Sequence, residues 1–275
     1  MRGLIALVMA AFFVASCSNH DLVVDHPSSD SMDDRVDREK KDASITQSKW
    51  KQALIVGAAD MVGGYSGAKA GAFWGGLLGP KGAVFGGVVG CIIGGCGASL
   101  GASKMIVPPG SRRQLTLALA DFRDFPNSTD SIGWIHNEFV LQTFNTIYQG
   151  DTAPSDSLVY SALVDRVISR GYDNDDIQSI FPVEKYLSVV AQYDSVDSMD
   201  DLVALMKNVN QPLDDFWRGL LSELRATTNA DDALRVLVRH RSSISSLPVS
   251  QDEKSALNHA LAVGYYSIGL WSSNN

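Results

Sequence analysis

The amino-acid sequence predicts an all-α protein, and two patterns carry this prediction. Glycine recurs at every fourth residue from Gly63 to Gly79 and again from Gly82 to Gly94, which places small residues on one face of a helix. Apolar residues of the C-terminal half recur at intervals of three and four, and no alternation of apolar and polar residues is long enough for a sheet. With 275 residues, 45% of them hydrophobic, the chain can bury one helical domain beside targeting and membrane segments. Its net charge of −8 argues against nucleic acid as a partner.

Residues 1–16 have the pattern of a secretory signal peptide, with a Met-Arg start and an apolar stretch over 4–14. The Val-Ala-Ser-Cys sequence that ends at Cys17 resembles the lipobox of bacterial lipoproteins. This resemblance implies cleavage before Cys17 and lipidation of the new N-terminus; an uncleaved membrane anchor with an incidental cysteine is the alternative. Because Ser18 is not the aspartate that retains such lipoproteins in the inner membrane, we expect an exported protein anchored in the outer membrane.

Residues 17–46 are predicted to form a lipidated, disordered and acidic tether. They mix acidic with basic side chains and contain almost no apolar residues that a core could bury. Directly after them, Lys49 and Lys51 flank Trp50, an arrangement typical of an anchor at a membrane interface. A tryptophan at the start of a buried helix has the same appearance in a sequence.

Residues 47–106 are predicted to form a membrane hairpin of two glycine-zipper helices. A glycine in a helix interior costs about 1 kcal/mol relative to alanine, so this segment needs an environment that enforces helicity, as lipid does. A flexible linker is the alternative, but the bulky apolar residues between the glycines argue against it. The residues expected to pack the two helices are Gly63, Gly67, Gly71, Gly75 and Gly79 on the first arm and Gly82, Gly86, Gly90 and Gly94 on the second.

A turn signature from Gly79 to Gly82 separates the two arms of this hairpin. The second arm has no charged residue up to Ser103, and at ~1.5 Å per residue it is long enough to cross a hydrocarbon layer of ~30 Å. The first arm contains Asp60 and Lys69, and Lys69 points away from the glycine face toward lipid, another subunit or a wet pore. We therefore expect the hairpin to self-associate or to be only partly immersed in the lipid bilayer.

Residues 107–275 are predicted to form a separate all-helical domain. The expected helices are 112–125, 131–149, 155–171, 182–193, 199–208, 212–225, 230–242 and 252–271. The last helix has the clearest apolar stripe, which includes Leu257, Leu261 and Ile268.

Few residues of this chain are candidates for chemistry. His136 and Glu138 form the most distinctive polar cluster, although one histidine near one carboxylate is more often a structural pair. No spacing of histidines or cysteines predicts a metal site or a cofactor. Cys91 and Cys96 lie five residues apart on one expected helix, so we interpret them as small packing residues, and an intermolecular disulfide stays open.

The lipobox, the polar tether and the glycine-zipper hairpin together resemble bacterial glycine-zipper lipoproteins of the 17 kDa surface-antigen type, over roughly the first 105 residues. The 131–149 segment and the Tyr-Tyr-Ser-Ile-Gly-Leu-Trp ending at Trp271 resemble uncharacterised exported proteins of Bacteroidetes. The first resemblance implies a cell-envelope lipoprotein that is not an enzyme, with a helical domain that binds or scaffolds an unknown envelope protein. Two alternatives stay open: a bacteriocin-like protein that permeabilises membranes, and an exported enzyme that uses His136 and Glu138.

Overall fold

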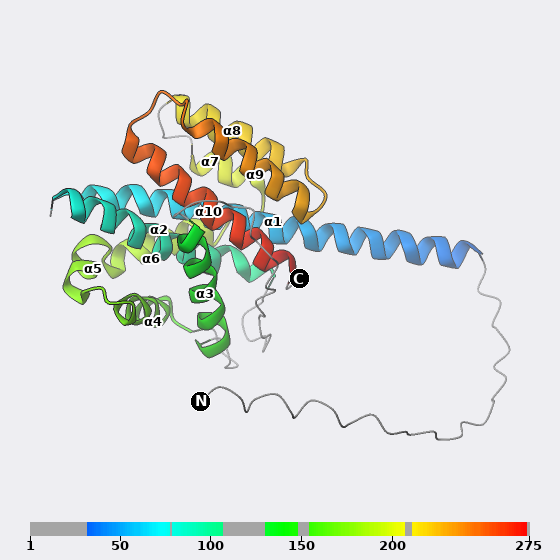
Figure 1. Cartoon of the computed structure of the whole chain (residues 1–275). Coiled ribbons are helices and arrows are strands. Elements are labelled where there is room, and N and C mark those ends of the chain that lie inside the picture. The colour runs from blue at the N-terminus through cyan, green and yellow to red at the C-terminus, as the bar shows by residue number, and fades with distance from the viewer. Residues whose placement is uncertain (1–31, 78, 107–129, 148–153, 207–210, 274–275) are drawn as a thin grey trace, which may run out of the picture. The chain divides into compact units, whose positions relative to one another are not determined.

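The computed structural model describes residues 32–77, 79–106, 130–147, 154–206 and 211–273, and these are helical with short connections and contain no strand (Figure 1). The helices are α1 (Met32–Gly76), α2 (Pro80–Ala102), the 3-10 helix η1 (Ser103–Met105), α3 (Asp130–Ile147), α4 (Asp156–Ser169), α5 (Asn174–Ile180), α6 (Val183–Tyr193), α7 (Met199–Leu205), α8 (Gln211–Arg225), α9 (Ala230–Ile244) and α10 (Gln251–Ser273). The all-α prediction is confirmed for these residues. The predicted signal peptide, Cys17 and the predicted helix 112–125 lie outside them.

Helix α1 begins inside the segment predicted to be a disordered tether. Its first residue is Met32, so α1 includes residues 32–46 of the segment that the sequence predicted to be disordered. The sequence has no glycine or proline between Met32 and Val56, and it places acidic and basic residues four apart, as in Asp37 and Lys41. Adding residues to an existing helix costs much less than nucleating one, so a helix formed at residues 48–76 extends readily through this polar stretch.

The chain divides into two compact units, Met1–Asp42 and Ala43–Asn275. Of the first unit the structure describes only residues 32–42, the start of α1. All other described residues belong to the second unit, which contains both the glycine-rich helices and α3 to α10.

The predicted turn between the glycine-rich helices is present. Gly79 precedes α2 with a φ of 98°, a left-handed value that a residue with a side chain rarely adopts. Pro80 follows as the first residue of α2, a position at which the missing N–H costs nothing. The hairpin therefore turns at the residues that the sequence indicated.

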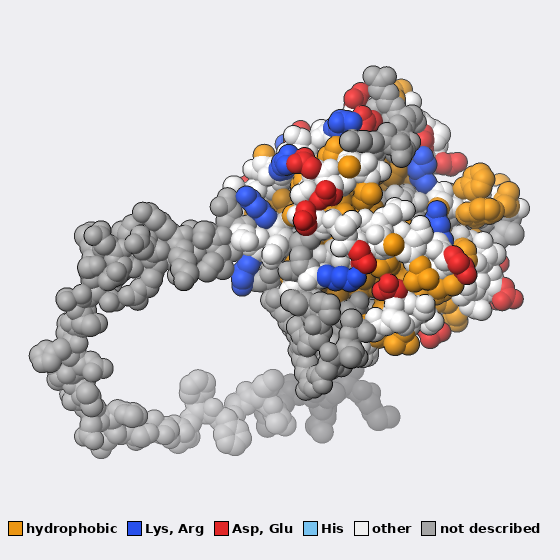
Figure 2. All heavy atoms as spheres, turned by 180° about the vertical axis from the view of Figure 1, so that it is seen from behind, with side chains coloured by type: hydrophobic (Ala, Val, Ile, Leu, Met, Phe, Trp, Pro, Cys, Tyr) orange, Lys and Arg blue, Asp and Glu red, His pale blue; other side chains and the backbone are white. Residues whose placement is uncertain are grey.

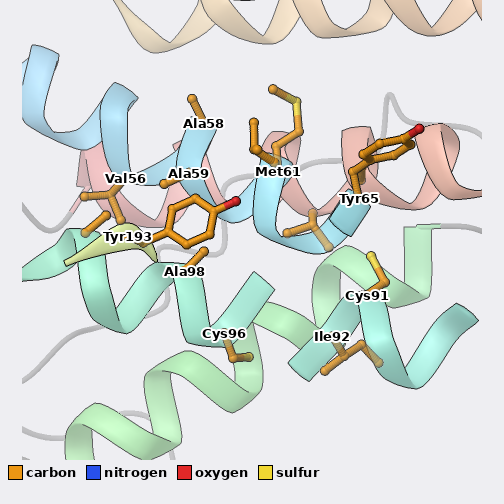
Figure 3. Close-up of a cluster of buried hydrophobic side chains, with 14 of the residues drawn as sticks. Val56, Ala58, Ala59, Met61, Tyr65, Cys91, Ile92, Cys96, Ala98 and Tyr193 are labelled. Carbon is orange, nitrogen blue, oxygen red and sulfur yellow. The ribbon is translucent and has the colours of Figure 1, made fainter. Parts of the chain in front are cut away.

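The second unit has one continuous core, which the hairpin shares with the C-terminal helices (Figure 1; Figure 3). Helix α2 contacts α3, α6 and α10, and α10 also packs on α3 and α9. The core therefore continues past residue 106, where the sequence analysis expected a separate domain to begin. Helix α2 is apolar around its whole circumference, and in this structure protein helices cover the faces for which the sequence suggested lipid.

Among the described residues, the C-terminal helices begin and end within a few residues of the predicted boundaries. Helix α5 is the exception, because it was not predicted. Helix α5 has seven residues, too few for an apolar period to be visible. Its start is fixed by Asp173, whose side chain accepts hydrogen bonds from the backbone N–H groups of Asp175 and Asp176. Helix α7 begins with a capping box between Ser198 and Asp201.

Candidate functional site

The glycines of α1 and α2 face each other in an antiparallel register. Gly63 lies against Gly94, Gly67 against Gly90, Gly71 against Gly86 and Gly75 against Gly82. A Cβ atom added at Gly94 would lie 2.6 Å from the carbonyl oxygen of Gly63, and one at Gly67, Gly71 or Gly75 would overlap the opposite carbonyl group outright. The two backbones are therefore in direct contact, and no other residue fits at these positions.

Further glycines let other helices approach the hairpin equally closely. A Cβ at Gly101 of α2 would lie 3.0 Å from both the Tyr193 side chain and the Val190 backbone of α6. A Cβ at Gly264 of α10 would lie 2.8 Å from the Cβ of Met61 on α1. Small residues therefore allow close packing of α6 on α2 and of α10 on α1, as well as of the two arms on each other.

Asp60, in the middle of α1, lies in a buried polar cluster that we call the carboxyl cluster: Asp60, Ser99 of α2, His136 of α3, and Ser267 and Trp271 of α10. The hydroxyl groups of Ser99 and Ser267 donate to Oδ2 of Asp60, the first at 2.9 Å, and Nε1 of Trp271 donates to the same oxygen at 3.4 Å. Four helices thus meet at one carboxyl group. The sequence showed Asp60 only as a charged residue in an apolar arm. Its hydrogen-bond partners on α10 are more than 200 residues away in the chain, so no local pattern indicated them.

Burial keeps both titratable groups of the carboxyl cluster uncharged. Removal from water raises the pKa of Asp60 to about 8, against the lowering effect of its hydrogen bonds, and lowers the pKa of His136 to about 4. Nε2 of His136 lies 3.9 Å from Oδ2 of Asp60, too far for a hydrogen bond. Within the described part of the chain, neither that nitrogen nor Oδ1 of Asp60 has a hydrogen-bond partner. We interpret the two side chains near neutral pH as neutral neighbours rather than as an ion pair.

His136 and Glu138 do not form a shared site. The His136 ring is fully buried, with Nδ1 3.2 Å from the side-chain oxygen of Asn137. Glu138 forms an ion pair with Arg170 and accepts a hydrogen bond from Gln142. The two side chains therefore have different partners: Asn137 for His136, and Arg170 and Gln142 for Glu138.

Lys69 points away from the glycine face, as predicted, and its side chain is partly exposed. Its Nζ atom lies 3.6 Å from a carboxylate oxygen of Glu253 in the first turn of α10 and 5.7 Å from the centre of the Tyr65 ring. Trp50 is buried, and its Nε1 donates to the carbonyl oxygen of Thr227 at 3.2 Å. Of the two open interpretations of Trp50, the structure supports the buried one.

The turn end of the hairpin carries a patch of exposed apolar side chains that we call the tip: Phe73, Trp74, Leu77 and Val84. Their exposed fractions are 67%, 47%, 71% and 70%. Figure 2 shows hydrophobic side chains gathered at the edge of the molecule where α1 and α2 turn, at the right of the view. The sequence placed these residues on the zipper arms but gave no sign that they would stay uncovered while most other apolar residues of the hairpin are buried.

A surface cavity of about 480 Å³ lies between the end of α9 and the start of α10. Arg241 and Lys254 line it, together with serine, glutamine and asparagine side chains. Nζ of Lys254 donates to the carbonyl oxygen of Ser245 at 2.8 Å, so that cation already serves to join the two helices. None of the carboxyl cluster lines this cavity.

Cys91 and Cys96 are free and buried on α2. Among the described residues, no group of three or more histidine, cysteine, aspartate or glutamate side chains is arranged to hold a metal ion. One described helix, α2, is long and apolar enough to cross a membrane, and 78% of its most apolar window is buried inside the protein. The chain matches no protein-family model, no curated protein and no solved structure with which it was compared.

Proposed function

We propose that this protein is a non-catalytic cell-envelope lipoprotein, attached to the outer membrane by lipid on Cys17. In this proposal the glycine-rich hairpin is directed to the membrane and the surrounding helices act as a scaffold or a binding module for an envelope protein. The observation that carries the proposal is the tip, because apolar side chains left in solvent at the end of an otherwise enclosed hairpin mark an interaction surface. The lipobox-like sequence before Cys17 supplies the independent argument for attachment.

The glycine faces of α1 and α2 are occupied by each other within one chain. Self-association through these faces would require the hairpin to open. A scaffold role does not require the hairpin to open, because the closed hairpin already packs against α3, α6 and α10.

Metabolic labelling with a fatty acid tests the attachment. The parent chain should incorporate label and fractionate with membranes, and Cys17→Ala should lose the label. Equal labelling of the two would contradict the lipoprotein proposal. Ser18→Asp, which leaves the cysteine in place, tests the choice of membrane, because it should move the labelled protein toward the inner membrane.

The second candidate function is permeabilisation of a membrane, and it is favoured by the length and composition of α2, which has no charged residue between Lys81 and Lys104. It requires the hairpin to leave its protein neighbours and enter the bilayer. Dye release from lipid vesicles tests it: purified protein should release dye and cross-link as oligomers, and Gly71→Leu should abolish both. Absence of release by protein that is bound to the vesicles would contradict this candidate.

A further inference from the structure

We propose that the tip inserts into the interfacial layer of a lipid bilayer while the remainder of the hairpin stays packed inside the helical unit. This inference rests on the proposed membrane role and narrows it, because it makes the hairpin a shallow insertion device rather than a membrane span.

The composition of the tip fits the lipid interface. Phe73 and Trp74 contact each other edge to face with ring centres 5.4 Å apart, and Leu77 and Val84 lie on either side of the turn at Gly79. Tryptophan is enriched where hydrocarbon meets headgroups, because one side of its ring system is apolar and its N–H is polar. A mixture of aromatic and aliphatic side chains is therefore expected in a protein segment that inserts at the level of the lipid headgroups.

The charges around the tip also fit a membrane surface. Between Met61 and Ser103 the sequence has no acidic residue, and its only charged residues are Lys69 and Lys81, in a chain of net charge −8. Lys81 is exposed in the first turn of α2, directly beside the tip. Acidic groups are present on neighbouring helices: Glu253 pairs with Lys69, and α5, which contacts α2, has two aspartates in its first turn. We therefore expect apolar insertion to dominate, with a small additional preference for anionic lipid.

The form of the tip distinguishes a fluid layer from a protein partner. Four side chains around one tight turn form a small patch beside the roughly 20 to 30 residues that each partner contributes to a standard protein interface. A bilayer does not need a complementary flat surface, since lipid adapts to a small protrusion. The turn lies at an end of the hairpin and at an edge of the helical unit, where α5 also lies (Figure 1).

The enclosed part of the hairpin has reason to stay where it is. Asp60 is buried with hydrogen bonds to α2 and α10, and the glycine pairs hold α1 against α2 with no room for lipid between them. Insertion of the tip breaks none of these contacts, because its four side chains are already exposed.

Co-sedimentation with lipid vesicles tests the inference on the chain that begins at residue 18, so that neither the apolar signal peptide nor lipid on Cys17 can cause the binding. Vesicles of phosphatidylcholine, with and without phosphatidylglycerol, are the probe. We expect binding to both compositions. Leu77→Asp should weaken it at least about tenfold, since the burial of a leucine side chain is lost. Lys81→Ala should cost no more than about fivefold, and only on the anionic vesicles.

Leu158→Asp is the control, because Leu158 is another solvent-facing leucine, on α4 and 54% exposed. It should bind vesicles as the parent does. Equal binding of Leu77→Asp and Leu158→Asp, or no binding by the parent, would overturn the inference. A parent that is dimeric without lipid and becomes monomeric with Leu77→Asp would also overturn it, in favour of a second copy as the occupant of the tip.

Near-UV circular dichroism measures whether the rest of the hairpin stays in place. Tyr65 of α1 lies edge to face with Trp217 of α8 at 5.3 Å, so the aromatic signal reports on that packing. Apart from the contribution of Trp74 at the tip, the spectrum should be unchanged on vesicle binding, and its collapse would show that the hairpin leaves the helical unit. Failure of fatty-acid labelling at Cys17 would not affect this experiment, so the two proposals can fail separately.

Discussion

Replacement of Asp60 by asparagine changes how stability depends on pH, because the carboxyl cluster encloses a carboxyl group that stays protonated. The pKa of Asp60 is about 8 in the folded protein, against 3.8 for an ordinary aspartate. Between these values the folded state holds a proton that the unfolded state has released, so the Asp60 contribution to the free energy of unfolding decreases as pH rises. Below about pH 4 this contribution is fully present, and above about pH 8 it is lost.

His136 acts in the opposite direction over a lower range. Its pKa falls from 6.5 to about 4 on folding, so its contribution is present above pH 6.5 and lost as pH falls through 4. From pH 4 to 6.5 the two effects cancel, since each state then holds one proton on this pair. Cys96 and Tyr193, which interact with Asp60, have pKa values raised by burial and stay protonated over this range. In the parent alone, the net pH dependence of stability from this pair therefore lies between pH 6.5 and 8, whereas in the difference between the parent and Asp60→Asn the His136 contribution cancels.

From pH 6 to pH 8 the free energy of unfolding of the parent should fall by roughly 2 to 3 kcal/mol relative to that of Asp60→Asn, because one proton contributes ~1.4 kcal/mol per pH unit. Asparagine keeps the size and an oxygen that can accept from Ser99 and Ser267. Urea unfolding followed by far-UV circular dichroism gives the difference in free energy of unfolding between the parent and Asp60→Asn at pH 6 and again at pH 8. The contributions of all other titrating groups cancel in each difference. Asp194→Asn, at an exposed residue, is the control and should show no such change. A parent and an Asp60→Asn variant with parallel pH dependence would refute the protonated state of Asp60.

Two further predictions concern packing. Gly71→Ala should lower the free energy of unfolding by several kcal/mol or prevent folding, because its Cβ would overlap the carbonyl group of Gly86. Gly76→Ala should be neutral or raise that free energy by up to about 1 kcal/mol, because its Cβ would meet only a methyl carbon at 3.9 Å. Thermal unfolding measures both. Equal effects of the two would contradict the direct backbone contact. Trp50→Phe should cost about 1 kcal/mol through loss of its hydrogen bond to Thr227, and an unchanged urea midpoint would show that this bond contributes nothing.

The sequence predicted the hairpin well because its signals are local. Spacing by four determines a helical face, and Gly79 with Pro80 determines the turn, whatever surrounds them. The same local logic located the C-terminal helices and missed only the short α5. The protein neighbours of the hairpin were not predicted, because a helix apolar on all sides is suited equally to lipid and to a protein core.

The carboxyl cluster and the tip could not be predicted for a different reason. Asp60 depends on Ser267 and Trp271, and nothing local to α1 indicates which distant helix supplies hydroxyl and indole donors. The tip residues belong to the same apolar run as the buried ones, and only the lengths of the covering helices determine where burial stops. Both features depend on tertiary contacts that sequence periodicity does not contain.

The energetics of the enclosed hairpin favour shallow insertion over a full membrane span. Removing α2 from the helical unit would uncover apolar side chains such as Tyr186 and Val189 of α6, and removing α1 would uncover Val263 and Ile268 of α10. At ~1.5 to 3 kcal/mol for each large apolar side chain exposed to water, these four alone amount to roughly 6 to 12 kcal/mol, comparable with the whole stability of a typical domain. The bilayer would have to supply that energy before a span could form. Insertion of the tip exposes no new apolar surface, so it needs only the gain from burying side chains that are already in solvent.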